Sequence, residues 1–121
     1  MKIIDNNIEL YSGDDNVISY RHSDYTDLTS IDLYFTVKEV TDRSSDDSNA
    51  VYKVNPTDIV LQDIEVDGVI KSNAIAIIPV SKSSERIPVG AYKYDLQRVD
   101  DGVSTIMSGS YTVINDVTKR K

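Results

Sequence analysis

The sequence predicts an all-β protein: an antiparallel β-sandwich of about eight short strands, forming a single domain over residues 1–121. The first observation is the apolar composition, in which 14 valines and 14 isoleucines stand against five leucines and four alanines. β-Branched side chains pack well on a pleated surface and are poorer in helices. The second is the apolar–polar alternation of residues 31–38, and the third is a hairpin pattern over residues 87–114.

The first third of the chain predicts three strands. Short alternating runs occupy residues 8–11 and 17–20, and the polar residues 21–30 are expected to form a loop or a single turn. Residues 31–38 have one apolar face and one that is polar apart from Tyr34. One buried and one solvated face are typical of an antiparallel sheet in a sandwich. The inward residues of this strand are Ile31, Leu33, Phe35 and Val37.

The middle of the chain predicts a loop, then a short strand and a hairpin. Residues 41–49 contain no apolar side chain, so we expect a solvated loop there. A strand follows at residues 50–54. Residues 58–66 and 69–71 then form a hairpin around Asp67-Gly68, a pair that accepts the positive φ angles of a two-residue turn.

A further strand is expected at residues 74–80, separate from the preceding hairpin. Its residues Ala74 to Ile78 are all apolar, which predicts burial on both faces at the centre of the strand.

The last hairpin pairs residues 87–97 with residues 103–114. Its turn contains Asp101-Gly102, where we again expect positive φ angles. In the returning strand the apolar parity changes between Ile106 and Tyr111. An extra residue at Ser108-Gly109 would return the apolar side to the core, so we expect a β-bulge there.

Tyr92 and Tyr94 have the spacing of a tyrosine corner. In immunoglobulin-like sandwiches, a tyrosine near the start of the penultimate strand bonds nearby backbone, and the residue two positions on enters the core. The sequence therefore predicts an immunoglobulin-like sandwich in which Gly90, Tyr92, Tyr94, Phe35 and Gly109 have structural roles.

Composition and motifs favour no catalytic or cofactor chemistry. There is no cysteine, and His22 is the only histidine, which we interpret as an ordinary surface residue. The formal net charge of −7 disfavours nucleic acid as a partner. The longest apolar run has five residues, far below the ~20 of a membrane span, and the first residues lack the apolar region of a secretion signal.

Acidic residues offer two weaker alternatives. Asp14-Asp15 and residues 42–47 lack the spacing of a helix-loop-helix calcium site, although calcium on a loop stays open. No carboxylate pair stands out for glycoside hydrolysis. We therefore expect a non-enzymatic protein with no cofactor and no metal.

Several motifs, in this order along the chain, resemble a known family. They are Gly13-Asp14-Asp15, residues 34–38 (YFTVK), residues 88–97 (PVGAYKYDLQ), residues 101–106 (DGVSTI) and residues 109–113 (GSYTV). Together they are similar to the N-terminal β-sandwich module of upper baseplate proteins from tailed phages of Gram-positive bacteria, and the similarity runs from about Ile8 to Val117.

The resemblance implies a virion component that is assembled in the host cytoplasm and docks onto other phage structural proteins. Upper baseplate proteins continue into a helical linker and a further domain, whereas this chain ends at Lys121. We therefore expect a small accessory module of a tail baseplate or a capsid decoration protein.

A docking protein is expected to offer an apolar patch or an unpaired strand edge, to other virion proteins or to copies of itself. We expect those edges at the first and last strands, which have no sequence neighbour on one side. The alternative is a carbohydrate-binding module for host cell-surface glycans, with Tyr11, Tyr20 and Tyr25 as aromatic contacts. The expected edge residues are Ile8, Leu10, Tyr11, Tyr111 and Val113.

Overall fold

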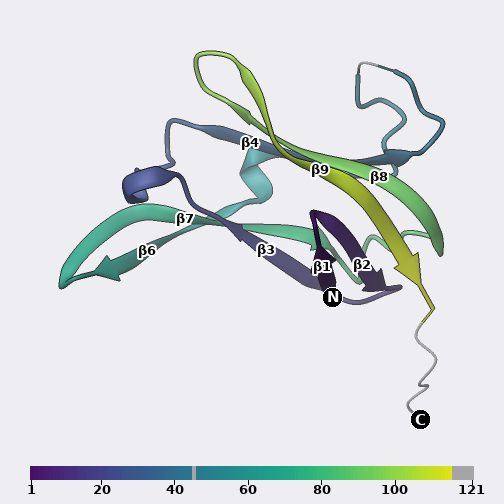
Figure 1. The fold of residues 1–121 in the computed structure, drawn as a ribbon, viewed down its shortest axis with the longest axis horizontal. Helices are drawn as coiled ribbons and strands as arrows, with labels where there is room; N and C mark the ends of the chain where they lie inside the picture. Colours follow the sequence, from purple (N-terminus) through teal and green to yellow (C-terminus); the bar gives the residue numbers. More distant parts are fainter. Residues whose placement is uncertain (45, 116–121) are drawn as a thin grey trace, which may run out of the picture.

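The computed structural model describes residues 1–44 and 46–115, which form nine strands in two packed sheets (Figure 1). The described part contains no α-helix, only two short 3-10 turns, η1 (Ser23–Tyr25) and η2 (Pro56–Asp58). The all-β prediction is confirmed. The strands are β1 (Lys2–Ile4), β2 (Asn7–Tyr11), β3 (Asn16–Tyr20), β4 (Asp32–Glu39), β5 (Tyr52–Val54), β6 (Val60–Val66), β7 (Val69–Ser81), β8 (Gly90–Val99) and β9 (Val103–Ile114).

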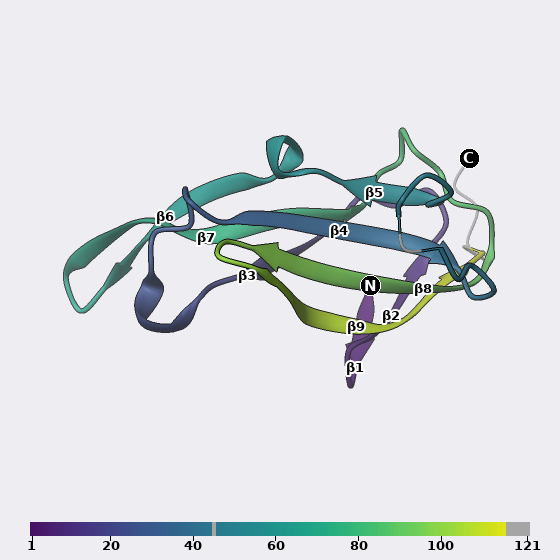
Figure 2. The ribbon, with the colours of Figure 1, turned by 90° about the horizontal axis from the view of Figure 1, so that it is seen from above.

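The larger sheet has six strands in the order β1-β2-β9-β8-β4-β5. All of its neighbours are antiparallel except β2 and β9, which run parallel and place Ile8 beside Tyr111. A parallel pair needs a long connection, and here that connection is most of the domain. Viewed from above, β4, β8 and β9 lie side by side, with β5 beyond β4 (Figure 2).

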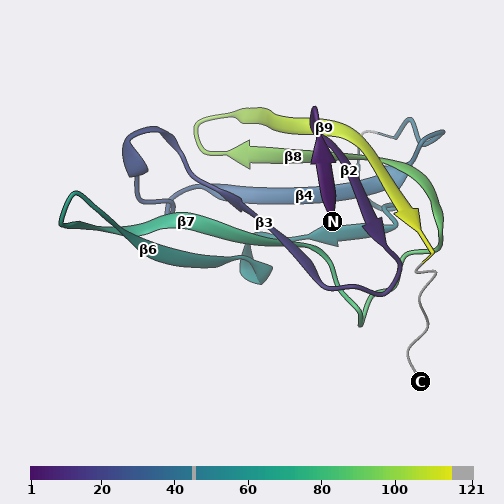
Figure 3. The same cartoon turned by 60° about the horizontal axis from the view of Figure 1, so that its bottom comes forward.

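The smaller sheet has the order β3-β7-β6, with the 13-residue β7 in the middle (Figure 3). The hairpin from β6 to β7 turns at Asp67 and Gly68, whose φ angles of 51° and 80° are those of the predicted two-residue turn. The separation of residues 69–71 from residues 74–80 is wrong. One continuous strand, β7, covers both ranges. At Asn73, whose φ is 51°, the pairing with β6 shifts in register, but the strand continues.

The core packs large rings from the six-stranded sheet against aliphatic residues from the three-stranded sheet. Phe35 and Tyr94 are 0% and 4% exposed, and their ring centroids lie 5.4 Å apart. The inward residues of β7 are aliphatic and almost fully buried, which leaves room for these rings. They are Ala74, Ala76, Ile78 and Val80.

Four core tyrosines donate their hydroxyl groups to backbone carbonyls. Tyr92 donates to Pro88 at 2.7 Å, four residues upstream, which is the contact expected of a tyrosine corner. Tyr111 donates to Val80 at 2.7 Å and Tyr52 to Pro79, so each of these links the two sheets. Tyr94 donates to Asn6 at 2.6 Å, which ties the turn between β1 and β2 to the core. Burial raises the pKa of all four tyrosines.

Two expectations about β9 are wrong. The bulge lies at Ile106, because Leu96 pairs with Met107 whereas Gln97 pairs with Thr105. Gly109 pairs regularly with Tyr94 and has no positive φ. Its small size is needed for another reason, since a Cβ there would lie 2.5 Å from the backbone oxygen of Asn6.

The turn that joins β8 and β9 also differs from its prediction. Val99 pairs with Val103, so the loop has three residues, and Gly102 does not have a positive φ.

The two strands expected to be edges, β2 and β9, are not edges. β2 lies between β1 and β9, and β9 lies between β2 and β8. The additional strand β1 covers this side of the sheet; all three of its residues are exposed, so no alternation marks it in the sequence. Of the five expected edge residues, four are at most 3% exposed and Tyr11 is 41% exposed. The buried four are Ile8, Leu10, Tyr111 and Val113.

Candidate functional site

The outward face of the six-stranded sheet is polar. Residues directly opposite each other on antiparallel strands share a face, so Thr36 lies beside Asp95, and Lys38 lies beside Lys93. The same face carries further polar residues on β9, β2 and β5. They are Ser108, Ser110, Thr112, Glu9 and Lys53.

The outward face of the three-stranded sheet is apolar. On β7, residues alternate with the buried inward set, so Ile75, Ile77 and Pro79 point outward. Val17 on β3 pairs with Pro79, and Val60 on β6 pairs with Ile77, which places both valines on this outward face. We call these five residues, Val17, Val60, Ile75, Ile77 and Pro79, the apolar face.

The apolar face is open to solvent in the single chain. Val17 is 54% and Val60 is 59% exposed, while the three residues on β7 are partly exposed. The remaining outward residues paired with them are Ser19 and Gln62, so no charged side chain lies at these positions. In a chain that is 27% charged, such a surface is distinctive.

The prediction that residues 74–78 are buried on both faces is therefore wrong for the single chain. The inward face of β7 is covered by the six-stranded sheet, whereas Ile75 and Ile77 on the outward face are only partly buried. An apolar run of this kind is typical of a strand whose two faces are both covered. The outward face of β7 thus stays partly exposed although its sequence has the pattern of a strand covered on both faces.

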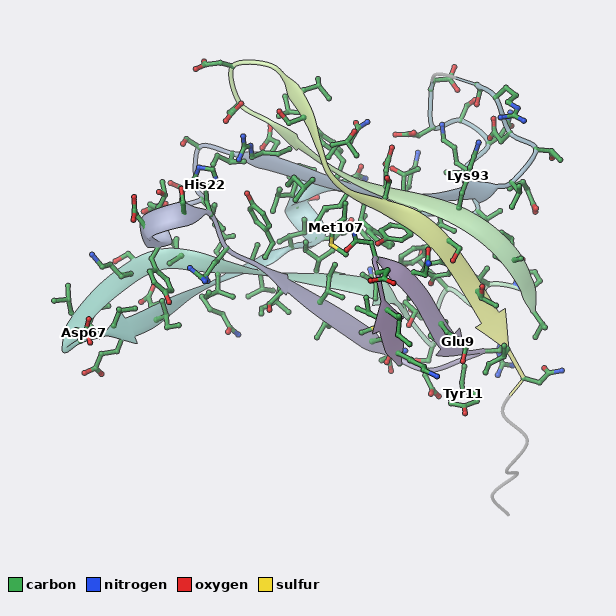
Figure 4. The ribbon with its side chains drawn as sticks, in the orientation of Figure 1. Glu9, Tyr11, His22, Asp67, Lys93 and Met107 are labelled. Atoms are coloured by element: carbon green, nitrogen blue, oxygen red, sulfur yellow. The ribbon has the colours of Figure 1, made fainter. Side chains whose placement is uncertain are left out.

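Two further exposed aliphatic residues, which are neighbours on β7 and so point to opposite faces of the sheet, lie near the tip of the hairpin that joins β6 and β7. Val69 and Ile70 are 53% and 60% exposed there. Asp67 marks this tip, which extends away from the six-stranded sheet (Figure 4). Large exposed aliphatic residues are thus found along much of the smaller sheet.

A groove of about 410 Å³ lies on the polar outward face of the six-stranded sheet. Its polar lining includes Thr36, Lys38, Lys93, Asp95 and Ser108. The pKa of Asp95 is raised above its ordinary value, mainly by burial and to a smaller extent by the nearby negative charge of Asp47. No sequence pattern marks this groove, because only the register of β4 on β8 brings the two lysines together.

The loop that follows β4 closes one side of this groove, and its backbone oxygens accept hydrogen bonds from both lysines. Lys38 donates to the backbone oxygens of Ser44 and Asp46, at 3.2 and 2.6 Å, and lies 3.5 Å from a carboxylate oxygen of Asp47. Lys93 donates to the backbone oxygen of Asp42. Like charges directly opposite on neighbouring strands repel, and these loop contacts offset that repulsion.

Two aspartates of the same loop, Asp42 and Asp46, accept hydrogen bonds from serines of that loop. Asp42 accepts from the backbone and hydroxyl of Ser44, and Asp46 accepts in the same way from Ser48. These hydrogen bonds lower the pKa of Asp42 and Asp46. Among the described residues, no group of three or more metal-binding side chains comes together.

His22 lies in a polar cluster at the end of β3. Its Nδ1 is 2.9 Å from a guanidinium nitrogen of Arg98 and 3.2 Å from the Tyr20 hydroxyl (Figure 4 shows its position beside η1). Arg98 also lies 3.6 Å from a carboxylate oxygen of Asp100. The cluster links the end of β3 to the end of β8, so its contacts are structural.

The three tyrosines of the glycan alternative do not form a shared platform. Tyr20 is engaged with His22 and Arg98. The Tyr25 ring lies 4.6 Å below the guanidinium carbon of Arg21. Tyr11 lies on β2 in the other sheet, well away from His22 (Figure 4).

Comparison of the sequence with protein-family models and with curated proteins finds no match. Within the described part of the chain, no helix has the length and apolar character needed to cross a membrane. The resemblance to baseplate modules thus rests on the motifs themselves.

Proposed function

We propose that this protein is a non-enzymatic structural or accessory component of a phage virion, in a tail baseplate or as a capsid decoration protein. The observation that carries the proposal is the apolar face, because an uncharged and exposed sheet face suits docking. The virion setting comes from the motif resemblance.

We further propose that the sandwich is of the immunoglobulin-like type. Tyr92 supports this, since its hydroxyl contacts the carbonyl of Pro88 as in a tyrosine corner. The parallel pairing of β2 with β9 adds an N-terminal strand to the sheet that holds the corner.

The polar groove supports a binding role more than hydrolysis. Glycoside hydrolysis uses two carboxyl groups that flank the scissile bond. Asp95 is the single carboxylate among the residues that line the groove, and its neighbours there are lysines and hydroxyl groups.

The proposal is tested on virus particles. Mass spectrometry of purified particles from the host that carries the gene should detect the chain in stoichiometric amounts. Particles that lack the chain, although it is expressed during their assembly, would contradict the proposal.

A matched pair of variants then tests the apolar face. Ser19 is exposed and pairs with Ile77 on that face, whereas Ala91 is exposed and pairs with Thr112 on the polar face. Ser19→Asp places a charge in the docking surface and should reduce incorporation into particles by at least about tenfold. Ala91→Asp adds the same charge on the other sheet and should leave incorporation unchanged.

The second candidate function is glycan binding, and the groove of about 410 Å³ is the observation that favours it. Hydroxyl groups on Thr36 and Ser108 and the carboxylate of Asp95 face a ligand-sized volume. Binding on an array of host cell-surface glycans, lost in Thr36→Val and Asp95→Asn but kept in Ser19→Asp, would favour this function over docking.

A further inference from the structure

We infer that the groove on the six-stranded sheet binds an uncharged sugar, with Thr36, Asp95 and Ser108 bonding its hydroxyl groups and Tyr34 packing against its ring. The inference rests on glycan binding, the second candidate function, and adds to it the charge class of the ligand and an aromatic contact. Three features of the groove support it: a row of polar side chains, the charges along the groove and the position of Tyr34.

Three polar side chains form one row across neighbouring strands of the groove. Thr36 on β4 lies directly opposite Asp95 on β8, and Asp95 lies directly opposite Ser108 on β9. All three line the groove, and neighbouring strands are about 4.8 Å apart, so the row spans roughly 10 Å. Thr36 is only 6% exposed although it stands on the outward face. The groove therefore has a hydroxyl group on each side of a carboxylate, an arrangement that suits a ligand rich in hydroxyl groups.

The carboxylate of Asp95 is short of hydrogen-bond donors. Burial raises its pKa, and the hydrogen bond that it accepts from the Gln97 amide is long, at 3.4 Å. Lys38 donates to backbone oxygens of the loop and lies 3.5 Å from a carboxylate oxygen of Asp47 instead. Within the described part of the chain, Asp95 forms no ion pair. A carboxylate that is partly removed from water gains from each donor that a ligand supplies.

The charges along the groove favour an uncharged ligand. Lys38 and Lys93 line the groove together with Asp95, so both signs of charge are present. A cationic ligand would meet the two ammonium groups, and an anionic ligand would meet the carboxylate. Both lysines already donate to backbone oxygens of the loop, which leaves them less able to bind an anion. A neutral hydroxyl group can donate to Asp95 without meeting a like charge.

Tyr34 places an aromatic ring beside this row. It lies two residues before Thr36 on β4, so the two share the outward face and are about 6.6 Å apart along the strand. Tyr34 is partly exposed, and it is the aromatic exception on a face of β4 that is otherwise polar. Ligand sites commonly combine aromatic surface with a few polar groups that fix orientation. The ring of Tyr34 suits the apolar C–H face of a sugar whose hydroxyl groups reach Asp95.

Amide chemical shifts of the full chain, recorded with added monosaccharides, test this inference. The neutral probes are glucose, galactose, mannose and N-acetylglucosamine, and each is matched with its amino sugar and its uronic acid. At least one neutral probe, added up to about 50 mM, should produce saturable shift changes at residues 36, 95 and 108. Residues 17, 60 and 77 on the other sheet should stay constant. The charged forms of that sugar should bind at least about fivefold more weakly.

Matched variants then assign the roles of the side chains. Asp95→Asn keeps the size of the side chain and removes its charge, and it should raise the dissociation constant by at least about tenfold. Tyr34→Ala should raise it by at least about fivefold, whereas Tyr34→Phe keeps the ring and should stay within about twofold of the original value. Ser19→Asp, on the other sheet, should bind the sugar as the unaltered chain does.

The outcomes separate this inference from both candidate functions. Binding of charged sugars alone, or equal binding by Tyr34→Ala and Tyr34→Phe, would overturn the inference and leave glycan binding in place. A chain that responds to none of the sugars would remove the inference and the glycan candidate together. The virion proposal depends on the apolar face and on incorporation into particles, so it is decided separately.

Discussion

At the scale of single residues, the buried aromatic side chains of the six-stranded sheet divide into two roles. Phe35 and Tyr94 fill the centre of the core, whereas Tyr92 lies at its margin and contacts Pro88 through its hydroxyl. Loss of a ring leaves a cavity, while loss of one hydroxyl removes one hydrogen bond. The two kinds of change therefore have different expected costs.

We predict that Tyr94→Ala and Phe35→Ala each lower the free energy of unfolding by about 3–5 kcal/mol. Tyr92→Phe should lower it by only about 0.5–1.5 kcal/mol, because the ring stays in place. Urea denaturation of the three variants measures these differences. Equal losses for Tyr92→Phe and Tyr94→Ala would contradict the two roles.

Gly109 is a second residue with a specific steric role. A Cβ at this position would lie 2.5 Å from the backbone oxygen of Asn6 and 3.0 Å from the side-chain oxygen of Asn7. The backbone of Asn6 is itself held by the Tyr94 hydroxyl, so it cannot move away freely. We predict that Gly109→Ala lowers the free energy of unfolding by about 1–3 kcal/mol, through overpacking.

The control for Gly109→Ala is a glycine in open space on the same strand pair. No atom lies within 4 Å of a Cβ built on Gly102. Gly102→Ala should be neutral, or stabilise by up to about 1 kcal/mol through the unfolded chain. Thermal melts of the two variants compare them directly, and an equal loss in both would remove the steric explanation.

At the scale of elements, local patterns predict hairpins well and predict their details less well. Both Asp-Gly pairs mark real hairpin turns, but only Asp67-Gly68 has the positive φ angles of a two-residue turn. The loop after Val99 has three residues, and this loop length follows from the bulge at Ile106 and the register of the whole hairpin. A dipeptide alone does not carry that information.

The two turns predict opposite responses to the same substitution. Gly68 has a φ of 80°, where a side chain costs about 1–2 kcal/mol. We therefore predict that Gly68→Ala lowers the free energy of unfolding by about 1 kcal/mol, whereas Gly102→Ala does not. Chemical denaturation checks this pair, and a neutral Gly68→Ala would show that the turn can adopt another type.

The parallel pairing of β2 with β9 could not be predicted from the local sequence pattern. Ile8 and Tyr111 are distant in sequence, and their pairing depends on how the chain returns after both sheets have formed. The alternation correctly marks Ile8, Leu10, Tyr111 and Val113 as one-sided apolar residues. It cannot tell whether their strands lie at an edge or inside a sheet, since both give the same period.

At the scale of the whole molecule, the sequence predicts two layers because one-sided strands must bury their apolar faces. For most strands the sequence marks one apolar face and one polar face. The run from Ala74 to Ile78 differs, since its residues are all apolar and so mark both faces of β7 as apolar. The polar groove had no such signal, because Lys38 and Asp95 look like ordinary outward residues of separate strands.

The buried tyrosines also make the stability of the whole molecule depend on alkaline pH. Burial raises the pKa of Tyr52, Tyr92, Tyr94 and Tyr111 in the folded protein above the ordinary value of about 10. The unfolded chain therefore loses these protons at lower pH than the folded chain does. Between the two pKa values the folded state binds more protons, so the free energy of unfolding falls as pH rises.

We predict that the contribution of these tyrosines to stability is fully present below pH of about 10 and falls progressively above it. Denaturation midpoints at a series of pH values, read with phenolate absorbance, should show these four tyrosines ionising together with unfolding. Tyr111→Phe is the matched variant, because it keeps the ring at the most enclosed site and removes one ionisable hydroxyl. Its stability should decline less steeply above pH of about 10. Unchanged stability at strongly alkaline pH, or ionisation of these tyrosines without unfolding, would contradict their enclosure between the two sheets.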